Sequence, residues 1–156
     1  MPVRSYTSNL NALWFLIAAN VLIFIITLVR PEAIFFLGLI PALLLHHPWT
    51  IITNLFVHAG FWHILCNMIS LYFIGSFLLR LVGEGKFLLV YFLGGLLGNI
   101  FYILLGPSHI PGVGASGAIF ALGGALAMMA PRIPVFVFFI PIPVPLWAAI
   151  VIFLII

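Results

Sequence analysis

Apolar runs broken by glycine, proline or charged residues divide the chain into segments that predict its helices. A helix that crosses a membrane needs roughly 20 mostly apolar residues to span about 30 Å of hydrocarbon. Three runs have about that length, and a fourth is shorter. They predict four full helices, over Leu10–Val29, His63–Leu81, Phe87–Leu105 and Ala115–Ala130, with a turn at Gly83–Lys86 between the second and the third.

The segment Pro31–Trp62 is also apolar, but prolines and histidines interrupt it every few residues. The interruptions are Pro31, Pro41, Pro48 and the pair His46-His47. A proline inside a helix removes a hydrogen bond and clashes with the preceding turn, which excludes one continuous helix here. We expect short helices that lie at the membrane interface, with Trp49 and Trp62 as interfacial anchors.

Alternating prolines mark the last part of the chain. No helix runs through Pro141, Pro143 and Pro145, so a fifth helix begins near Pro145, which suits a first-turn position. Leu146–Ile156 then extends about 16 Å at 1.5 Å per residue, about half a membrane. We therefore expect residues 1–156 to form a single transmembrane domain that is truncated at its C-terminus.

Composition places this chain in a membrane. Hydrophobic residues make up 66% of the 156 residues and charged residues only 4%, whereas a soluble domain carries about 25% charged residues. So few charges cannot coat a water-exposed surface, which excludes a soluble globular enzyme, a nucleic-acid binder and a disordered chain. The sequence predicts an all-α polytopic membrane protein in contact with the lipid bilayer. It suggests no cofactor, and the single cysteine, Cys66, excludes an intramolecular disulfide.

The basic residues predict the orientation, because basic residues gather in cytoplasmic loops. An N-terminus in the cytoplasm puts four of the five basic residues inside and only Arg30 outside. The four are Arg4, Arg80, Lys86 and Arg132. In this topology Pro31–Trp62 and Gly106–Gly114 face the outer side of the cell membrane.

A serine in a glycine-rich sequence, Gly114-Ala115-Ser116-Gly117, stands at the outer end of the fourth predicted helix. The glycines leave its hydroxyl open, which suits a nucleophile. They also suit close helix packing, because a stripe of small residues on this helix matches Gly94-x-x-x-Gly98 on the third. The stripe consists of Gly117, Ala121 and Gly124 or Ala125. The motif alone leaves both interpretations open.

His63 and Asn67 are four residues apart and therefore lie on one face of the second predicted helix. Polar groups inside a membrane are costly, and they mark a functional site or a buried hydrogen-bond pair. The residues alone suggest Ser116 as nucleophile, His63 as base and Asn67 as orienter. Pointing at the serine, the pair would also suit donors to a developing oxyanion. Irregular spacing argues against a metal site at His58, His63 and Cys66.

The fourth predicted helix, with 16 residues, is about 24 Å long at 1.5 Å per residue. It therefore begins below the outer surface, and the loop Gly106–Gly114 dips into the membrane. Irregular backbone at that depth is tolerated only where it lines a protein-enclosed or wet cavity. We expect Ser116 at the floor of such a cavity, which opens to the outer face.

Three motifs resemble those of the rhomboid family of intramembrane serine proteases. Trp49-Thr-Ile-Ile-Thr-Asn-Leu-Phe-Val-His58 resembles W-R-x-x-T-x-x-F-x-H. It runs on into His58-Ala-Gly-Phe-Trp-His63-Ile-Leu-Cys-Asn67, which resembles H-x-x-x-x-H-x-x-x-N. Gly114-Ala-Ser116-Gly117 resembles the family's G-x-S-G helix start. The similarity extends from about Leu10 to the end of the chain.

The resemblance implies a rhomboid-like helical bundle with an interfacial loop between its first and second helices. Four full helices and the start of a fifth lie in this chain, and the sixth is absent. Ser116 would be the nucleophile of an acyl transfer that cleaves transmembrane segments of membrane-protein substrates, with His63 and Asn67 stabilising the oxyanion. The supporting positions would be His58, Gly114, Gly117 and Phe120. The general base would be a histidine on the sixth helix, which revises the role of His63 as base.

The chain departs from the family pattern at Thr50, where arginine is usual, at Leu79, where an acidic residue is frequent, and at Phe120, where tyrosine is frequent. The largest departure is that no histidine follows His109. A serine without a base is a poor nucleophile, so we expect these 156 residues to be inactive as they stand. They are either a piece of an active protease or a pseudoprotease that binds transmembrane helices without cutting them. A channel or transporter fits less well, because the polar residues cluster in the outer half.

Overall fold

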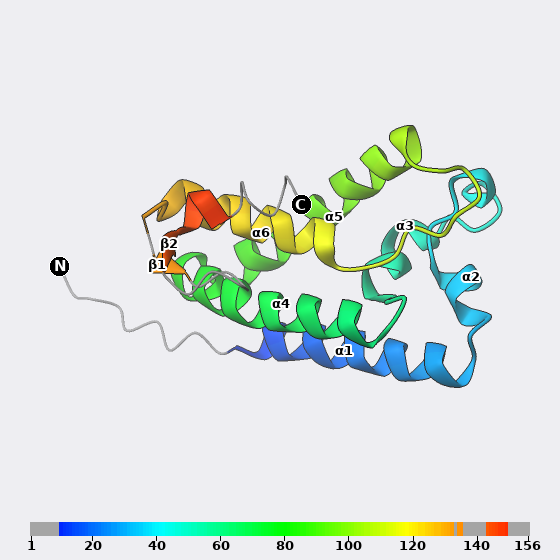
Figure 1. The fold of residues 1–156 in the computed structure, drawn as a ribbon, viewed down its shortest axis with the longest axis horizontal. Coiled ribbons are helices and arrows are strands. Elements are labelled where there is room, and N and C mark those ends of the chain that lie inside the picture. The colour runs from blue at the N-terminus through cyan, green and yellow to red at the C-terminus, as the bar shows by residue number, and fades with distance from the viewer. Residues whose placement is uncertain (1–9, 133, 136–142, 150–156) are drawn as a thin grey trace.

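The computed structural model describes residues 10–132, 134–135 and 143–149. Four long helices, α1, α4, α5 and α6, run alternately in opposite directions and form a bundle (Figure 1). The elements in chain order are α1 (Asn11–Val29), α2 (Ala33–Leu37), η1 (Pro41–Leu43), α3 (Thr50–Thr53), η2 (Asn54–Phe56), α4 (Phe61–Val82), α5 (Glu84–Leu105), α6 (Ser116–Met129), β1 (Pro134–Val135) and β2 (Val144–Pro145).

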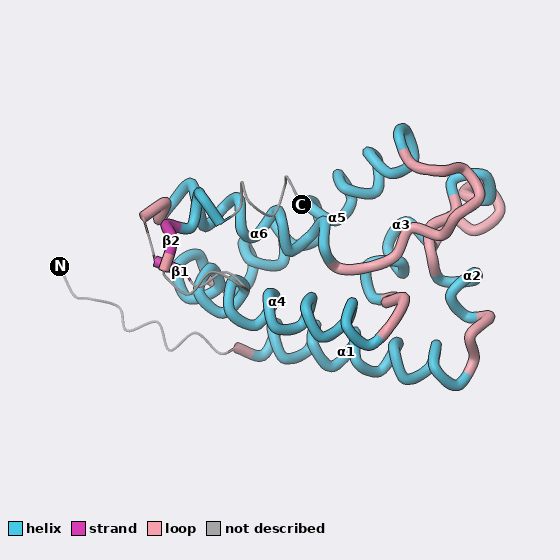
Figure 2. Tube along the Cα trace, viewed as in Figure 1, coloured by secondary structure: helices cyan, strands magenta, loops and turns pink. Residues whose placement is uncertain are grey.

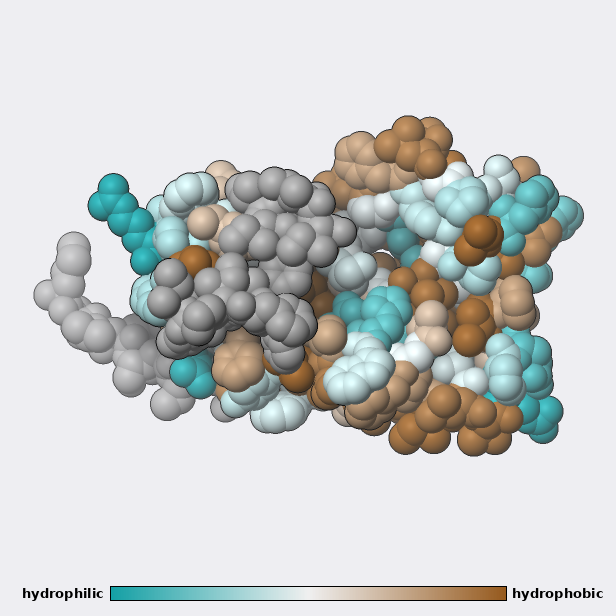
Figure 3. Space-filling model, in the orientation of Figure 1, coloured by the Kyte–Doolittle hydropathy of each residue, from teal (hydrophilic) through white to brown (hydrophobic). Residues whose placement is uncertain are grey.

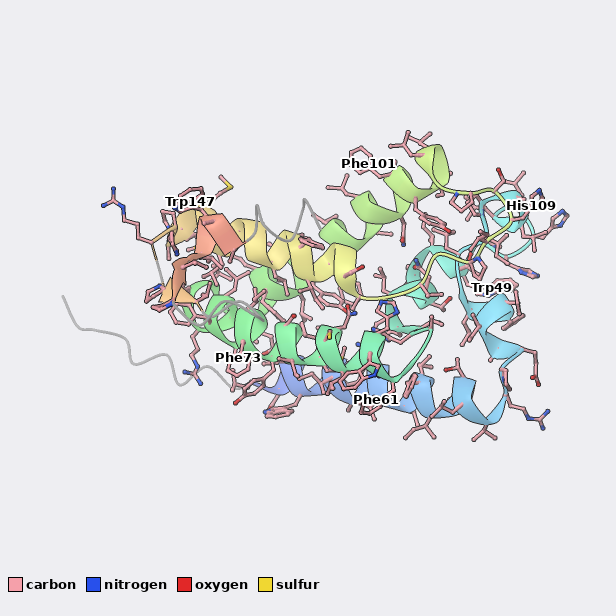
Figure 4. The ribbon with its side chains drawn as sticks, in the orientation of Figure 1. Trp49, Phe61, Phe73, Phe101, His109 and Trp147 are labelled. Carbon is pink, nitrogen blue, oxygen red and sulfur yellow. The ribbon has the colours of Figure 1, made fainter. Side chains whose placement is uncertain are left out.

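The four predicted helices are confirmed, each within three residues of its predicted ends. α1, α4 and α5 are long and apolar enough to cross a membrane, whereas α6 has only 14 residues. Apolar side chains cover their outer surfaces, among them Phe61, Phe73 and Phe101, each more than 60% exposed (Figure 4). Figure 3 shows hydrophobic side chains along the upper and lower margins of the bundle, and hydrophilic ones at the end that carries α2 and α3, at the opposite end and in the middle of this face. The protein is a multi-pass membrane protein.

The predicted four-residue turn at Gly83–Lys86 is wrong. α4 continues to Val82 and α5 begins at Glu84, so Gly83 alone connects them. Its φ of 83° lies in the left-handed region, which glycine adopts without a Cβ clash. Its N–H donates to the carbonyl of Leu79 at 2.8 Å and closes α4. One left-handed residue is therefore enough to reverse the chain.

The segment between α1 and α4 folds into short helices, as its prolines predict. α2, η1, α3 and η2 have three to five residues each. Trp49 Nε1 donates to the carbonyl of Phe36 at 2.9 Å, and the Trp49 ring stacks on His47. Thr50 is buried, and its Oγ1 donates to the carbonyl of His47 at 2.7 Å. Thr50 thus holds two parts of this segment together. The position of the segment at the membrane interface stays a prediction, and so does the role of the exposed Trp62 as an interfacial anchor.

The core lies between the four long helices. Its fully buried residues include Leu13, Leu71, Leu78, Leu79, Phe87 and Leu122. Leu79 has no exposed surface, so the position at which the family often carries an acidic residue is here part of the apolar core. Burying a leucine or phenylalanine side chain stabilises a fold by about 1.5–3 kcal/mol in water, but in a bilayer close packing takes over that role.

The predicted stripe of small residues is confirmed at the contact between α5 and α6. A Cβ added to Gly94 would overlap the Cβ of Ala121, and one added to Gly98 would lie 3.4 Å from Gly117 Cα. The two backbones can approach this closely because neither glycine has a side chain. Gly124, which the sequence offered as a member, has nothing within 4 Å of an added Cβ and lies outside the contact.

The basic residues divide between the two ends of the bundle as predicted. α4 ends, α5 begins and α6 ends at one end, at the left of Figure 1. Arg80, Lys86 and Arg132 therefore lie at this end, and Arg30 follows α1 at the opposite end. Arg4 lies outside the described residues. Which end faces the cytoplasm stays a prediction.

The proline-rich stretch after α6 contains a feature that the all-α prediction missed. Pro134 pairs with Pro145 and Val135 with Val144 in a two-stranded antiparallel ladder. Prolines exclude a helix at these positions, whereas the valines favour extended backbone. Residues 146–149 are helical directly after Pro145, as predicted. The rest of the predicted fifth helix, 150–156, lies outside the described residues.

Candidate active site

Ser116 is the first residue of α6, and its side chain is exposed. Because Gly117 packs against Gly98, the start of α6 lies level with a point seven residues before α5 ends at Leu105. At 1.5 Å per residue this point is about 10 Å below that end. The short helix therefore begins below the end of its neighbour, as its length predicts.

The loop between α5 and α6 runs back along the segment that follows α2 (Figure 2). Leu39 and Gly112 exchange both backbone hydrogen bonds, at 3.0 and 2.8 Å. Ala42 N–H donates to the carbonyl of Ser108 at 2.9 Å. Irregular backbone at membrane depth must find such partners, because lipid offers none. The loop is thus held by protein as it leads down to Ser116.

Gly114 holds the backbone two residues before Ser116 in a conformation that favours glycine. Its φ is 118°, and its N–H donates to the carbonyl of Asn54 at 3.0 Å. A Cβ at this position would lie 2.8 Å from His63 Nε2 and 3.8 Å from Ser116 Oγ. The His63 imidazole therefore packs against the backbone at Gly114, two residues before Ser116.

His63 and Asn67 lie on one face of α4, as their spacing predicts. His63 Nδ1 accepts the N–H of Ala59 at 3.4 Å, so the neutral ring carries its proton on Nε2. Nε2, the ring atom nearest Gly114, is then a hydrogen-bond donor. Asn67 Nδ2 donates to the carbonyl of His63 at 2.8 Å. The buried Asn67 Oδ1 has no partner within the described part of the chain.

A cavity of about 170 Å³ between α4 and α6 brings three of the predicted site residues together. Its lining residues are Cys66, Asn67, Ser70, Ile74, Ser116, Ile119, Phe120 and Gly123. Ser116 lines it from the start of α6 and Asn67 lines it from α4, whereas His63 is not among the lining residues. The Phe120 ring, 39% exposed, lies one turn below the serine. Most of the lining is apolar, so the few polar groups stand out chemically.

His58, Cys66 and His109 lie at three separate positions in the structure. His58 is 1% exposed, and its ring meets that of His63 edge-on at 5.0 Å between centroids. Cys66 is exposed in the cavity. His109 is exposed at the far end of the loop before α6 (Figure 4). Among the described residues, no group of three His, Cys, Asp or Glu side chains is placed to hold a metal ion.

Sequence reasoning missed two asparagines beside the site. A second cavity, of about 180 Å³, lies on the other side of Ser116, and both Asn54 and Asn99 line it. They are buried, at 3% and 6% exposed, and their carboxamides bond to each other. Asn99 interrupts an apolar helix, and a polar residue inside a membrane segment is a signal that could have found it. Its partner, 45 residues earlier, was not visible from the sequence.

Burial lowers the pKa of His58 from 6.5 to about 4, and the adjacent His63 acts in the same direction. In the unfolded chain His58 binds a proton near pH 6.5, whereas in the folded protein it binds one only near pH 4. The unfolded state therefore binds more protons between these values, and the free energy of unfolding falls as the pH drops through this window. A shift of this size corresponds to roughly 3 kcal/mol. We expect thermal unfolding in detergent at a lower temperature at pH 4.5 than at pH 7.5.

The control for this pH effect is His58→Gln, which removes the titrating ring. The variant should lose most of the pH dependence over the same window. If it keeps the full dependence, another group causes the effect and His58 is excluded as its source.

The family model described as Rhomboid domain matches residues 45–156. The Bacillus subtilis (strain 168) protein YdcA is 43% identical over 81 residues, which cover 52% of this chain and 41% of YdcA. Rhomboid protease GluP of the same organism is 38% identical over 82 residues, 53% of this chain and 16% of GluP. Inactive RHOMBOID-like protein 8 of Arabidopsis thaliana is 33% identical over 81 residues, 52% of this chain and 23% of that protein. The chain thus spans less than half the length of these relatives.

The matched residues include α3, η2, α4, α5 and α6, and with them His63, Asn67 and Ser116. The match covers more than half of the chain, and the helical bundle agrees with it. This chain therefore belongs to the rhomboid family.

Proposed function

We propose that this protein is an intramembrane serine protease that cleaves transmembrane segments of membrane-protein substrates. The observation that carries the proposal is the exposed Ser116 at the start of α6, in a cavity that it shares with Asn67. A buried or tightly packed serine would suit helix packing alone. Ser116 instead faces open space large enough for a side chain of a substrate.

In the proposed reaction Ser116 Oγ attacks the carbonyl carbon of the scissile peptide bond, and the carbonyl oxygen becomes an oxyanion. The first N–H groups of α6 have no partner inside the helix and carry its positive partial charge. His63 Nε2–H and the Asn67 carboxamide complete the set of donors. The protonated Nε2 suits a hydrogen-bond donor and not a base. It therefore supports His63 as a stabiliser of the oxyanion, which the resemblance implies, over His63 as the general base, which the residues alone suggest.

The proton of Ser116 needs an acceptor other than His63. The sequence contains no histidine after His109, and His109 is exposed at the far end of its loop. We propose that the base is a histidine on a further helix of the full-length protein, packed against Phe120. This chain covers 41% of YdcA and 16% of GluP, which leaves room for such a helix in a protein of their length.

We propose a location in the cell membrane, with the N-terminus in the cytoplasm and the cavity open to the outer face. The separation of Arg80, Lys86 and Arg132 from Arg30 supports this orientation. Substrate segments would enter from the bilayer and unwind to expose a peptide bond at Ser116.

The second candidate is a pseudoprotease that binds transmembrane helices without cutting them. It is favoured by the similarity to Inactive RHOMBOID-like protein 8. The cavity between α4 and α6 would then hold a helix of the partner, and Ser116 would serve only in packing.

The test is a cleavage assay of the full-length protein in lipid vesicles that also contain a model substrate with one transmembrane segment. We expect cleavage by the wild type. Asn67→Ala should lower turnover by roughly ten- to a thousandfold, because one oxyanion donor is lost. Asn20→Ala is the matched control, since Asn20 is buried in α1 and, like Asn67, donates to the carbonyl four residues earlier in its own helix, at 2.7 Å.

The control should lose stability but keep its turnover. An Asn67→Ala variant as fast as the wild type would remove Asn67 from the site. If the wild-type protein co-purifies with the substrate but leaves it intact, the protease proposal is wrong and the pseudoprotease proposal takes its place.

A further inference from the structure

Two asparagines from different parts of the fold form a closed hydrogen-bonded pair beside the candidate site. Asn54 Nδ2 donates to Asn99 Oδ1 at 2.7 Å, and Asn99 Nδ2 donates to Asn54 Oδ1 at 2.9 Å. Asn99 Nδ2 also donates to the carbonyl of Ile51 at 2.6 Å. A carboxamide has two N–H donors and one carbonyl acceptor, and all of these groups of Asn99 are in use. We call this arrangement the asparagine clamp.

The asparagine clamp is rigid because it is buried and each carboxamide both donates to and accepts from the other. Asn54 and Asn99 are 3% and 6% exposed. In a low-dielectric interior a hydrogen bond is stronger than in water, and an unpaired polar group is costly. Rotation of either side chain would break two or more of these hydrogen bonds at once. The clamp therefore fixes η2 against α5 at Asn99, six residues before that helix ends at Leu105.

The main-chain carbonyl of Asn54 connects the clamp to the backbone just before Ser116. The Asn54 carbonyl accepts the N–H of Gly114 at 3.0 Å and that of Val57 at 3.2 Å, which occupies both of its lone pairs. Gly114, with its φ of 118°, stands two residues before Ser116 and directly against His63 Nε2. A displacement of Asn54 would break the hydrogen bond of the Gly114 N–H. The backbone at Gly114, which sets the position of the start of α6, would then be free to move.

We propose that Asn99 is a positioning residue for the candidate active site, which acts through Asn54 and Gly114 to hold Ser116 beside its oxyanion donors. The hydrogen bonds of both carboxamides go to each other and to the Ile51 carbonyl, and none goes to Ser116. The proposal rests on the proposed protease function for its effect on turnover. The placement of Gly114 by the clamp does not depend on that function.

The test compares Asn99→Leu, which keeps most of the volume and removes all three hydrogen bonds, with Asn20→Leu, the same change at a buried asparagine of α1. Asn99→Gln, which keeps the carboxamide on a longer side chain, is a second variant. Each full-length protein is measured in two ways: for kcat and KM on the model transmembrane substrate, and for amide hydrogen exchange of the peptide that covers residues 106–120.

We expect Asn99→Leu to exchange faster at 106–120 and to lose roughly ten- to a hundredfold in kcat, because small misplacements of a nucleophile have effects of this size. KM should change little, since the groups that contact the substrate remain. Asn99→Gln should recover part of both losses. Asn20→Leu should leave kcat and the exchange of this peptide unchanged, even if it unfolds at a lower temperature.

Unchanged exchange at 106–120 in Asn99→Leu would overturn the proposal. Equal losses of kcat in the Asn99 and Asn20 variants would also overturn it, because the effect would then follow general stability. If the wild-type protein does not cleave the substrate, the proposed protease function is wrong. The positioning role of Asn99 is then tested by the hydrogen-exchange measurement alone. If Asn99→Leu does not fold, Asn99→Gln decides. Its longer side chain must shift the clamp and should cause a partial loss, so wild-type values of both exchange and kcat would contradict a role in positioning.

Discussion

Replacing Ser116 by alanine is expected to abolish cleavage of a transmembrane substrate by the full-length protein and to leave its fold intact. The hydroxyl supplies the only bond to the acyl intermediate, so we expect a fall in turnover of roughly 10⁴-fold or more. The fold should tolerate the change because the Ser116 side chain is exposed and alanine is a good helix former. Cleavage is measured in lipid vesicles and stability by thermal unfolding in detergent.

Ser70→Ala is the matched control for this prediction. Ser70 lines the same cavity from α4 and carries the same hydroxyl. If the cavity only needs a polar lining, both variants should lose activity alike. If Ser116 is the nucleophile, Ser70→Ala should keep most of its turnover. Cleavage that persists in Ser116→Ala would show that the serine protease assignment is wrong.

Gly94→Ala is expected to be among the most destabilising single substitutions in the bundle. The new Cβ would overlap that of Ala121, so α5 and α6 must move apart along their whole contact. Overpacking of this kind costs about 1–3 kcal/mol, and more where backbone must shift. The same displacement tilts α6, which begins at Ser116. We therefore expect a lower unfolding temperature together with reduced turnover.

Gly124→Ala provides the comparison, because it makes the same chemical change in α6 where an added Cβ meets nothing within 4 Å. It should be neutral or slightly stabilising, since alanine is favoured over glycine inside a helix by about 1 kcal/mol. Equal stability of the two variants would contradict the close packing of α5 on α6.

Much of this fold could be predicted from the sequence, because a membrane acts on local properties of the chain. The length of an apolar run decides whether a helix can span, and Pro31, Pro41 and Pro48 exclude one long helix between α1 and α4. The short length of the fourth run similarly implied that α6 begins below the end of α5. The spacing of His63 and Asn67 placed both on one face of α4, and the match of Gly94 and Gly98 to Gly117 and Ala121 indicated which helices pack closely.

Some errors came from features that are local but too small for patterns to resolve. One left-handed residue, Gly83, replaces a turn of four, because a single positive φ reverses the chain as well as a longer loop does. The ladder of β1 and β2 has only two residues per strand. Gly124 resembled Gly117 in sequence, yet a Cβ added to it would have no atom within 4 Å.

The sequence by itself determined the spans, their breaks and the choice of Ser116 as the candidate nucleophile, since these depend on neighbours along the chain. Only the tertiary structure decided how the serine is held. The asparagine clamp joins residues 45 positions apart, and the Gly114 N–H donates to the carbonyl of Asn54 rather than to a group of its own loop. Hydrogen bonds form between groups that the fold brings within about 3 Å, and sequence spacing carries no record of which distant groups will meet.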